Sequence, residues 1–332
     1  MTLVDQSARD LQTMLRVAVD ASSIDDGDAT RLIHEFPNVA FKFANDSNSF
    51  AQAVNDSEVI FGKRLPYEAI IGSPRLRWVQ SGTAGVDALL GRGPWPTQIT
   101  LTNARGAHGT PISEQVVAMM LAFATRLHVL VRAHASEANV AQVVTRAKWD
   151  LAGQHVMILG LGDIGEAVAT RATALGMHVT GVRRSPAPTP GCARVLSPDA
   201  FRDYLSTTDH LVSCLPLTAQ TRHLIGAPEL HALPKGAHVY NVGRGAVIDG
   251  QALRHALADG HLGGAGLDCV DPSDIPAPGD PLWSHPEVIL GQHTSGHSPS
   301  NSRSITTIFA DNLRRFIEGE PLRNVVDPDR GY

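Results

Sequence analysis

The sequence predicts an α/β protein built from two doubly wound parallel sheets. Two observations lead to this expectation. Short apolar runs that suit strands alternate with helical stretches along most of the chain. The 332 residues exceed what one ordinary core holds, and they correspond to about two domains at a prior of roughly 150 residues each.

Composition excludes several classes of protein. The net charge of −5 shows no excess of basic residues, which a nucleic-acid-binding protein would be expected to have. With 18% charged and 43% hydrophobic residues, the composition is ordinary for a folded chain. Cys192, Cys214 and Cys269 are too far apart for a disulfide framework or a metal site. No apolar stretch reaches the ~20 residues that span a bilayer, and the N-terminus lacks the pattern of a signal peptide. We therefore expect a cytoplasmic protein with no metal, nucleic-acid or membrane partner.

Four apolar runs in the first hundred residues have the length and composition of strands, with helical stretches between them, as in parallel βα units. A long helix is then expected from Thr110-Pro111 to about Ala135, because threonine suits the N-cap and proline the first helical position. Such a helix would connect two domains. The four expected strands are Leu15–Val19, Val39–Phe43, Glu58–Phe61 and Leu76–Val79.

The remainder of the chain repeats a strand–helix pattern that favours a second doubly wound sheet. A helix is expected at Gly165–Leu175, directly after the first of these strands. The last segment, Asn301–Glu318, is amphipathic and is expected to pack back on the first domain. The strands of the second sheet are expected at His155–Leu159, Met177–Val182, His210–Ser213, Ala237–Val242, Ala265–Cys269 and Val288–Leu290.

A glycine-rich turn separates the first strand of this second sheet from its helix. It reads Gly160-Leu161-Gly162-Asp163-Ile164-Gly165. The first glycine permits a tight turn, the second lets the backbone approach a pyrophosphate, and the third lets helix and strand pack closely. Free amides and the partial positive charge at the helix N-terminus favour an anion there. A glycine turn without a ligand is the plain alternative, but the strand and helix on either side favour a dinucleotide.

The end of the next strand indicates which dinucleotide fits. An acidic residue there accepts hydrogen bonds from a ribose 2′-hydroxyl and repels a 2′-phosphate. This sequence has Arg183-Arg184-Ser185 instead, which offers two guanidiniums and a hydroxyl to a phosphate. A solvated basic turn is the alternative. We expect the cofactor to be NADP (NADPH) rather than NAD.

Further motifs follow one another along the chain: Gln80–Asp87, Leu215–Thr218, Asn241–Asp249, Gly264–Asp268, Asp280–Trp283 and Gly291–Gly296. Together with the glycine turn, their order and spacing resemble the D-isomer-specific 2-hydroxyacid dehydrogenases, and the resemblance covers nearly the whole chain. Within that family, the Arg-Arg-Ser segment is similar to the NADPH-using glyoxylate/hydroxypyruvate reductase branch. The resemblance implies a discontinuous substrate domain, 1–103 with 297–332, and an inserted NADP-binding Rossmann domain, 104–296.

The resemblance assigns the chemistry of 2-oxo acid reduction to a few groups. Arg244 matches the arginine that binds the substrate carboxylate and polarises the carbonyl, for which a permanently charged guanidinium with paired donors is suited. His293 matches the general acid, and His297 is a second candidate close by. The loop Thr83-Ala84-Gly85 resembles the backbone-amide grip on the same carboxylate, where small residues let the main chain approach.

The resemblance also implies further cofactor contacts. Asp268 matches a residue at the nicotinamide end of the site, and Trp283 is either a wall of the pocket or a core aromatic. The full expected set is Gly160, Gly162, Asp163, Ile164, Gly165, Arg183, Arg184, Ser185, Leu215, Pro216, Thr218, Thr221, Val242, Gly243, Asp268, His293 and Gly296.

One position departs from the family pattern. A glutamate that pairs with the catalytic histidine usually stands five residues after the aspartate matched by Asp268, and Ser273 occupies that position here. A serine can orient an imidazole, but it cannot stabilise imidazolium by charge. Asp271 and Asp274 lie on either side of it. Three hypotheses stay open: an adjacent aspartate substitutes for the glutamate, the histidine works with a lower pKa, or the enzyme is slow or specialised for another substrate.

The leading interpretation is NADPH-dependent reduction of a small 2-oxo acid, such as glyoxylate or hydroxypyruvate, to the 2-hydroxy acid. A nucleotide-sensing, corepressor-like binding protein with weak or no turnover is an alternative that Ser273 favours and that Arg244 and His293 disfavour. Oxidation of a formate or phosphite type of substrate is another alternative, which Arg183-Arg184 disfavours because those oxidations usually use NAD. The resemblance implies a homodimer around the long helix from Pro111.

Overall fold

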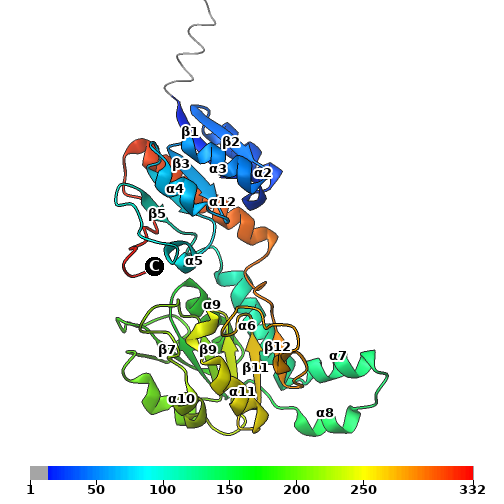
Figure 1. Cartoon of the computed structure of the whole chain (residues 1–332). Helices are drawn as coiled ribbons and strands as arrows, with labels where there is room; N and C mark the ends of the chain where they lie inside the picture. The colour runs from blue at the N-terminus through cyan, green and yellow to red at the C-terminus, as the bar shows by residue number, and fades with distance from the viewer. Residues whose placement is uncertain (1–13, 332) are drawn as a thin grey trace, which may run out of the picture. The chain divides into compact units, whose positions relative to one another are not determined.

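A computed structural model describes residues 14–331 (Figure 1). The chain divides into two compact units. Of the described residues, 14–107 and 298–331 form the split unit, and His108–His297 form the central unit. Each unit contains one parallel sheet flanked by helices, with five strands in the split unit and seven in the central unit. The α/β architecture predicted from the sequence is confirmed.

The split unit is a five-stranded parallel sheet in the order β2-β1-β3-β4-β5. The strands are β1 Leu15–Asp20, β2 Val39–Ala44, β3 Val59–Gly62, β4 Trp78–Ser81 and β5 Thr100–Thr102. The helices are η1 Ala21–Ser23, α2 Asp26–Glu35, α3 Ser47–Asn55, α4 Tyr67–Gly72, α5 Asp87–Leu90 and α12 Pro299–Glu318. Helices α2, α3 and α12 begin at side-chain caps, and at α3 Asp46 and Ser49 form a capping box.

The C-terminal helix α12 closes one face of this sheet, as its amphipathic pattern predicts. Phe309 of α12 stacks on Phe61 of β3 with ring centroids 4.5 Å apart, and it also contacts Trp78 of β4. Ile305 and Leu313, one turn to either side, are fully buried in the same core. Such aromatic pairs contribute beyond their burial alone, so α12 is an integral part of the split unit.

The central unit is a seven-stranded parallel sheet in the order β12-β11-β10-β9-β6-β7-β8. The strand order reverses beside β6, and ligands of open α/β sheets bind at such a point, outside the carboxyl ends of the strands. The strands are β6 His155–Leu159, β7 His178–Val182, β8 Arg194–Leu196, β9 His210–Ser213, β10 His238–Asn241, β11 Gly264–Leu267 and β12 Val288–Leu290. The helices are α6 Gly109–Ala124, α7 Leu127–Ala135, α8 Ala141–Ala147, α9 Asp163–Ala174, η2 Phe201–Thr207, α10 Ala227–Ala232, η3 Gly245–Val247, α11 Gly250–Ala258 and η4 Pro281–Trp283.

The expected long helix from Thr110 to about Ala135 is wrong in two respects. The helix begins earlier, at Gly109, and it breaks after Ala124 into α6 and α7, which are bent by 74°. At the break, Arg126 takes a left-handed conformation (φ 59°) and its guanidinium pairs with Glu287, which also contacts His128. The contact that redirects the chain therefore lies 161 residues away in sequence.

Apolar length alone does not identify a membrane segment in the part of the chain that the structure describes. No single helix there is long and apolar enough to cross a bilayer, and only α6 and α7 taken together, despite the bend, have the required length and composition.

Two histidines lie side by side in the core of the central unit. His210 of β9 and His238 of β10 are paired in register, with rings 5.6 Å apart, and Trp149 lies 5.3 Å from each. His210 Nδ1 is 3.1 Å from the Tyr240 hydroxyl. Burial lowers the pKa of His210 to about 3 and that of His238 to about 4, with the neighbouring imidazole contributing at His210 and Glu287 partly opposing the shift at His238. Both rings are therefore neutral in the folded protein at neutral pH.

These pKa values predict that acid destabilises the central unit. Between pH 6.5 and about 4 the unfolded chain binds protons at these rings and the folded chain does not, so stability is lost as pH falls through this window. Each ring accounts for about 2 kcal/mol of that loss at pH 5, by linkage from an unfolded pKa near 6.5. We expect His210→Phe to reduce the difference in urea unfolding free energy between pH 7.5 and pH 5. His134→Gln, an exposed control, should leave the difference unchanged. An equal difference in His210→Phe and wild type would contradict the prediction.

Candidate active site

The glycine turn joins β6 to α9 and leaves space on one side only. A Cβ on Gly165 would collide with the Gly160 carbonyl, and one on Gly160, whose φ is 95°, would crowd Leu215 and Cys214. These two glycines are required by packing of the protein on itself. At Gly162, by contrast, a Cβ would meet nothing within 4 Å. Open space at the second glycine, at the start of a helix, fits a pyrophosphate approaching the backbone.

The two residues that complete this turn face the protein. Asp163, the first residue of α9, has its carboxylate against Gly109 at the start of α6, where it leaves no room for a Cβ. Its Oδ2 is buried, and it has no hydrogen-bond partner among the described residues. Ile164 packs partly buried against the core between α6 and the sheet. The turn therefore presents backbone rather than side chains to a ligand.

Two arginines follow β7 at the carboxyl edge of the sheet. The Arg183 backbone is tied to β8 through Leu196, and its guanidinium lies 3.5 Å from the Glu166 carboxylate in the first turns of α9. Arg184 and Ser185 are exposed directly after it. Glu166 is not among the residues expected from the sequence, although its position one residue beyond the glycine turn could have drawn attention to it.

The loops after β9 and β10 pack on each other at the same edge. The Leu215 backbone lies so close to Gly243 that no side chain fits there. Thr221 holds its own loop in shape, since its hydroxyl donates to the Pro216 carbonyl (2.6 Å) and accepts from the Thr218 amide (2.8 Å). These residues, with Val242 buried behind them, lie at the carboxyl ends of adjacent parallel strands, as a dinucleotide site of this fold requires.

A histidine–carboxylate pair lies at the end of β12. His293 Nδ1 is 3.1 Å from Asp274 Oδ2, and both side chains are 45% exposed. The hydrogen bond from His293 lowers the pKa of Asp274, and Arg244 and the Gly245 amide lower it further. The same hydrogen bond, together with the charges of Asp274 and Asp268, raises the pKa of His293 against the opposing effects of burial and Arg244. The pair therefore favours imidazolium and carboxylate.

The other two candidates for this partnership lie elsewhere. Ser273 is exposed and donates its hydroxyl to the Ile275 carbonyl at 2.8 Å. Asp271 Oδ2 lies 3.4 Å from His223 Nε2. Of the three candidate partners, the structure brings only Asp274 to His293.

Arg244 follows β10, and its backbone is fixed from within the fold. The buried Asn241 side chain donates to the Arg244 carbonyl at 3.0 Å, and the Arg244 guanidinium donates to the Gly243 carbonyl at 2.9 Å. Arg244 is near enough to His293 and Asp274 to act on the pKa of both. The charge of Arg244 therefore acts on both members of the His293–Asp274 pair.

Asp268 shapes the loop that carries His293. Its carboxylate, only 3% exposed, accepts from the Thr294 amide (3.0 Å) and from the amide and hydroxyl of Ser295. The His293 amide donates to the Asp268 carbonyl at 2.7 Å. Gln292 and His293 both have left-handed backbones (φ 55° and 57°), which are unfavourable for these residue types. The hydrogen bonds to Asp268 offset that cost.

Two further expected residues lie in the same loop. Gly296 lies against His108 and Ile112 of the central unit, and His297 is exposed with its amide bonded to the Thr294 carbonyl at 3.0 Å. In the split unit, the half-buried loop Thr83-Ala84-Gly85 is closed by a hydrogen bond from the Thr83 hydroxyl to the Gly85 carbonyl at 2.8 Å.

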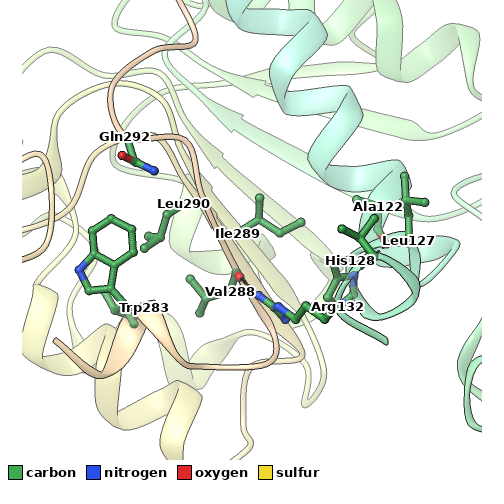
Figure 2. Close-up of a pocket in the computed structure, with 11 residues that line it drawn as sticks. Ala122, Leu127, His128, Arg132, Trp283, Val288, Ile289, Leu290 and Gln292 are labelled. Atoms are coloured by element: carbon green, nitrogen blue, oxygen red, sulfur yellow. Dashed lines mark hydrogen bonds between the residues drawn. The ribbon is translucent and has the colours of Figure 1, made fainter. Parts of the chain in front are cut away.

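A pocket of about 430 Å³ lies beside β12 and is lined in part by Gln292, the residue before His293 (Figure 2). Trp283 bounds one side, and Leu127, His128 and Arg132 bound the other. Trp283 is 42% exposed, so it is not a core aromatic, and its indole N–H donates to the Pro276 and Ala277 carbonyls of the loop that carries Asp274. Within residues 14–331, no group of three histidine, cysteine or acidic side chains could hold a metal ion.

Comparison with known proteins identifies the family. Residues 117–295 match the family model described as D-isomer specific 2-hydroxyacid dehydrogenase, NAD binding domain. The chain is 34% identical over 278 residues to a Streptomyces coelicolor protein named "Uncharacterized protein in mprR 3'region", covering 83% of this chain and 97% of that one. It is 28% identical to the glyoxylate reductase of Korarchaeum cryptofilum, covering 79% of each chain.

A solved structure agrees with these sequence matches. The D-isomer specific 2-hydroxyacid dehydrogenase of Xanthobacter autotrophicus Py2, in complex with NADPH and MES, superimposes with a TM-score of 0.82 at 29% identity, covering 96% of this chain and 99% of that one. The chain therefore belongs to the D-isomer specific 2-hydroxyacid dehydrogenase family, which confirms the resemblance seen in its motifs. It is an NAD(P)-binding enzyme of the 2-hydroxyacid dehydrogenase and 2-oxo acid reductase class.

The pairing of His293 with Asp274 can be tested without an activity assay. We expect Asp274→Asn to lower the pKa of the His293 imidazole, measured by NMR titration, because the charged hydrogen-bond partner is lost. The proton-donating form of His293 should accordingly disappear at a lower pH than in wild type. Asp271→Asn is the matched control, since its carboxylate faces His223. Equal His293 pKa values in wild type and Asp274→Asn would refute the pairing.

Proposed function

We propose that this protein reduces a small 2-oxo acid of the glyoxylate or hydroxypyruvate type to the 2-hydroxy acid, with NADPH as cofactor. The observation that carries the proposal is the His293–Asp274 pair beside Arg244, at the carboxyl edge of a dinucleotide-binding sheet. A relative named glyoxylate reductase and a similar structure in complex with NADPH support it.

The proton is delivered by His293 in this proposal. Since Nδ1 faces Asp274, Nε2 is the nitrogen left to donate a proton to the substrate carbonyl oxygen. Arg244 binds the carboxylate and polarises the carbonyl through its paired donors. We assign a second grip on the carboxylate to the amides of Thr83-Ala84-Gly85. Asp268 acts as a positioning residue for His293.

The cofactor is assigned to the turn and loops at this edge. The nicotinamide supplies the hydride when bound. Gly162 gives its phosphates access to backbone, and Arg183, Arg184 and Ser185 are the candidates for a 2′-phosphate. The remaining residues that we assign to the cofactor site, several of them through their backbone, are Gly160, Asp163, Ile164, Gly165, Leu215, Pro216, Thr221, Val242, Gly243, Asp268, His293 and Gly296.

A panel of 2-oxo acids assayed with NADPH and NADH in parallel tests this proposal. We expect reduction of glyoxylate or hydroxypyruvate with a higher kcat/KM for NADPH than for NADH. Arg183→Ala should lower kcat/KM for NADPH by about 10- to 100-fold, as loss of charge-assisted hydrogen bonds predicts, and spare NADH. Arg330→Ala, an exposed arginine outside the proposed cofactor site and outside α6, α7 and α8, is the control. Equal turnover with NADH would refute the cofactor assignment.

The same panel tests the alternative of a binding protein without turnover. That alternative drew its support from Ser273 at the expected glutamate position, and Asp274 beside His293 removes that support. Failure of every 2-oxo acid with both cofactors would overturn the proposed activity and favour the binding protein.

We also propose that the central unit forms a homodimer through α6, α7 and α8. In Figure 1, α7 and α8 project as an arm from the sheet of this unit. Large apolar side chains are exposed along these helices and continue toward the pocket beside β12. An exposed apolar surface of this kind marks an interaction site, and a second copy supplies the same surface in return. The exposed side chains are Leu121, Leu127, Leu130, Val131 and Val143.

Light scattering coupled to size-exclusion chromatography tests the dimer. Wild type should have twice the mass of the chain, and the double variant Val131→Glu, Val143→Glu should have the mass of one chain, because two charges then oppose burial of the surface. Ile71→Glu on α4, also exposed, is the matched control and should stay dimeric. A monomeric wild type at micromolar concentration would rule the dimer out.

A further inference from the structure

The loop Thr83-Ala84-Gly85 is held by its carbonyl groups. The Ala104 amide donates to the Thr83 carbonyl at 3.0 Å. The Asn103 side-chain amide donates to the Ala84 carbonyl at 2.8 Å. Two consecutive peptide groups are thereby oriented from the same side by consecutive residues that follow β5.

Holding these carbonyls also orients the amides. The C=O and N–H of a planar trans peptide point in opposite directions. The amides of Ala84 and Gly85 therefore point away from Asn103 and Ala104, and neither donates a hydrogen bond to any of the residues 14–331. Two successive N–H groups without acceptors are able to donate to a carboxylate oxygen.

Asn103 is itself fixed by the C-terminal segment. Its amide donates to the Asn324 carbonyl (3.1 Å), and its carbonyl accepts from the Asn324 side chain (3.3 Å). The side-chain oxygen of Asn103 accepts from the Arg105 amide at 3.2 Å, so both ends of its amide group are occupied. Asn103 is only 5% exposed, which leaves it a single arrangement.

Asn324 is anchored in turn. Its side chain also donates to the Arg105 carbonyl at 2.7 Å, and its backbone is left-handed (φ 57°). The next residues run antiparallel beside β5, where the Val326 amide donates to the Leu101 carbonyl at 2.9 Å and Val326 is buried. The C-terminal segment is therefore an integral part of the split unit.

From these contacts we infer that Asn103 is a positioning residue for substrate binding, and that Asn324 holds it in place. Asn103 fixes the Ala84–Gly85 peptide so that its N–H points at the substrate carboxylate. The inference rests on the proposed function, since it takes the substrate to be a 2-oxo acid bound through this loop. It assigns a role to Asn103 and to Asn324, which lie outside the motifs identified in the sequence.

Steady-state kinetics with glyoxylate test the inference. Asn103→Ala should raise the KM for glyoxylate, and the Ki of the 2-oxo acid analogue oxamate, by about tenfold, the effect expected for one lost hydrogen bond. The KM for NADPH should not change. Asn324→Gly keeps the left-handed backbone and removes the side-chain contacts with Asn103 and Arg105, so it should raise the same two constants by a smaller factor. Asn55→Ala, an exposed residue of α3, is the control.

The outcomes separate this inference from the proposed function. If wild type reduces glyoxylate and both variants keep its KM, the inference is overturned and the function stands. A parallel loss of NADPH binding in the variants, or a lower Tm with no KM effect, shows a merely structural role and also overturns it. If Asn103→Ala does not fold, the KM for glyoxylate and the Ki of oxamate measured for Asn324→Gly decide whether the inference holds. A wild type that reduces no 2-oxo acid overturns both.

Discussion

The buried carboxylate of Asp268 is the interaction on which the candidate active site depends. It gathers the amides of Thr294 and Ser295 and so holds the backbone of His293 in a left-handed conformation. Without that carboxylate the turn would relax toward ordinary backbone angles, at a gain of about 1–2 kcal/mol for each residue released. The position of the His293 backbone, from which its ring reaches Asp274, depends on this constraint.

The partner of His293 shows why counting along a motif is insufficient. Ser273 stands where the family pattern has its glutamate, yet its hydroxyl turns back to Ile275. Asp274, one residue later, reaches the imidazole because the loop closes through a hydrogen bond from the Val270 amide to the Asp274 carbonyl. A carboxylate that stabilises the imidazolium is therefore present, although the residue that supplies it lies one position later than in the family pattern. The order of residues in a motif does not determine which carboxylate contacts the histidine, because the conformation of the loop also matters.

The sequence predicted most of the fold because its strands carry strong apolar patterns. It missed β5 and β8, which are edge strands of three residues each and contain polar residues, whereas β12, equally short and also at an edge, is entirely apolar and was located. It also missed the break at Arg126, since the cause is Glu287, a partner distant in sequence. The glycine turn and the other motifs were located in the sequence, but the contacts of their side chains, such as Asp163 against Gly109, were beyond prediction.

One arrangement recurs at the loops that carry the proposed chemistry. Asn103 follows β5, Asn241 ends β10 and Asp268 follows β11, and all three side chains are at least nine-tenths buried. Each holds the backbone of a loop: Ala84, Arg244 and the residues after His293 respectively. A buried polar group must find partners, and at the carboxyl end of a parallel strand the nearest unpaired backbone belongs to a neighbouring loop. A polar residue at the end of an apolar strand is therefore a sequence signal for the residue that positions a site, even where the catalytic side chain lies on another loop.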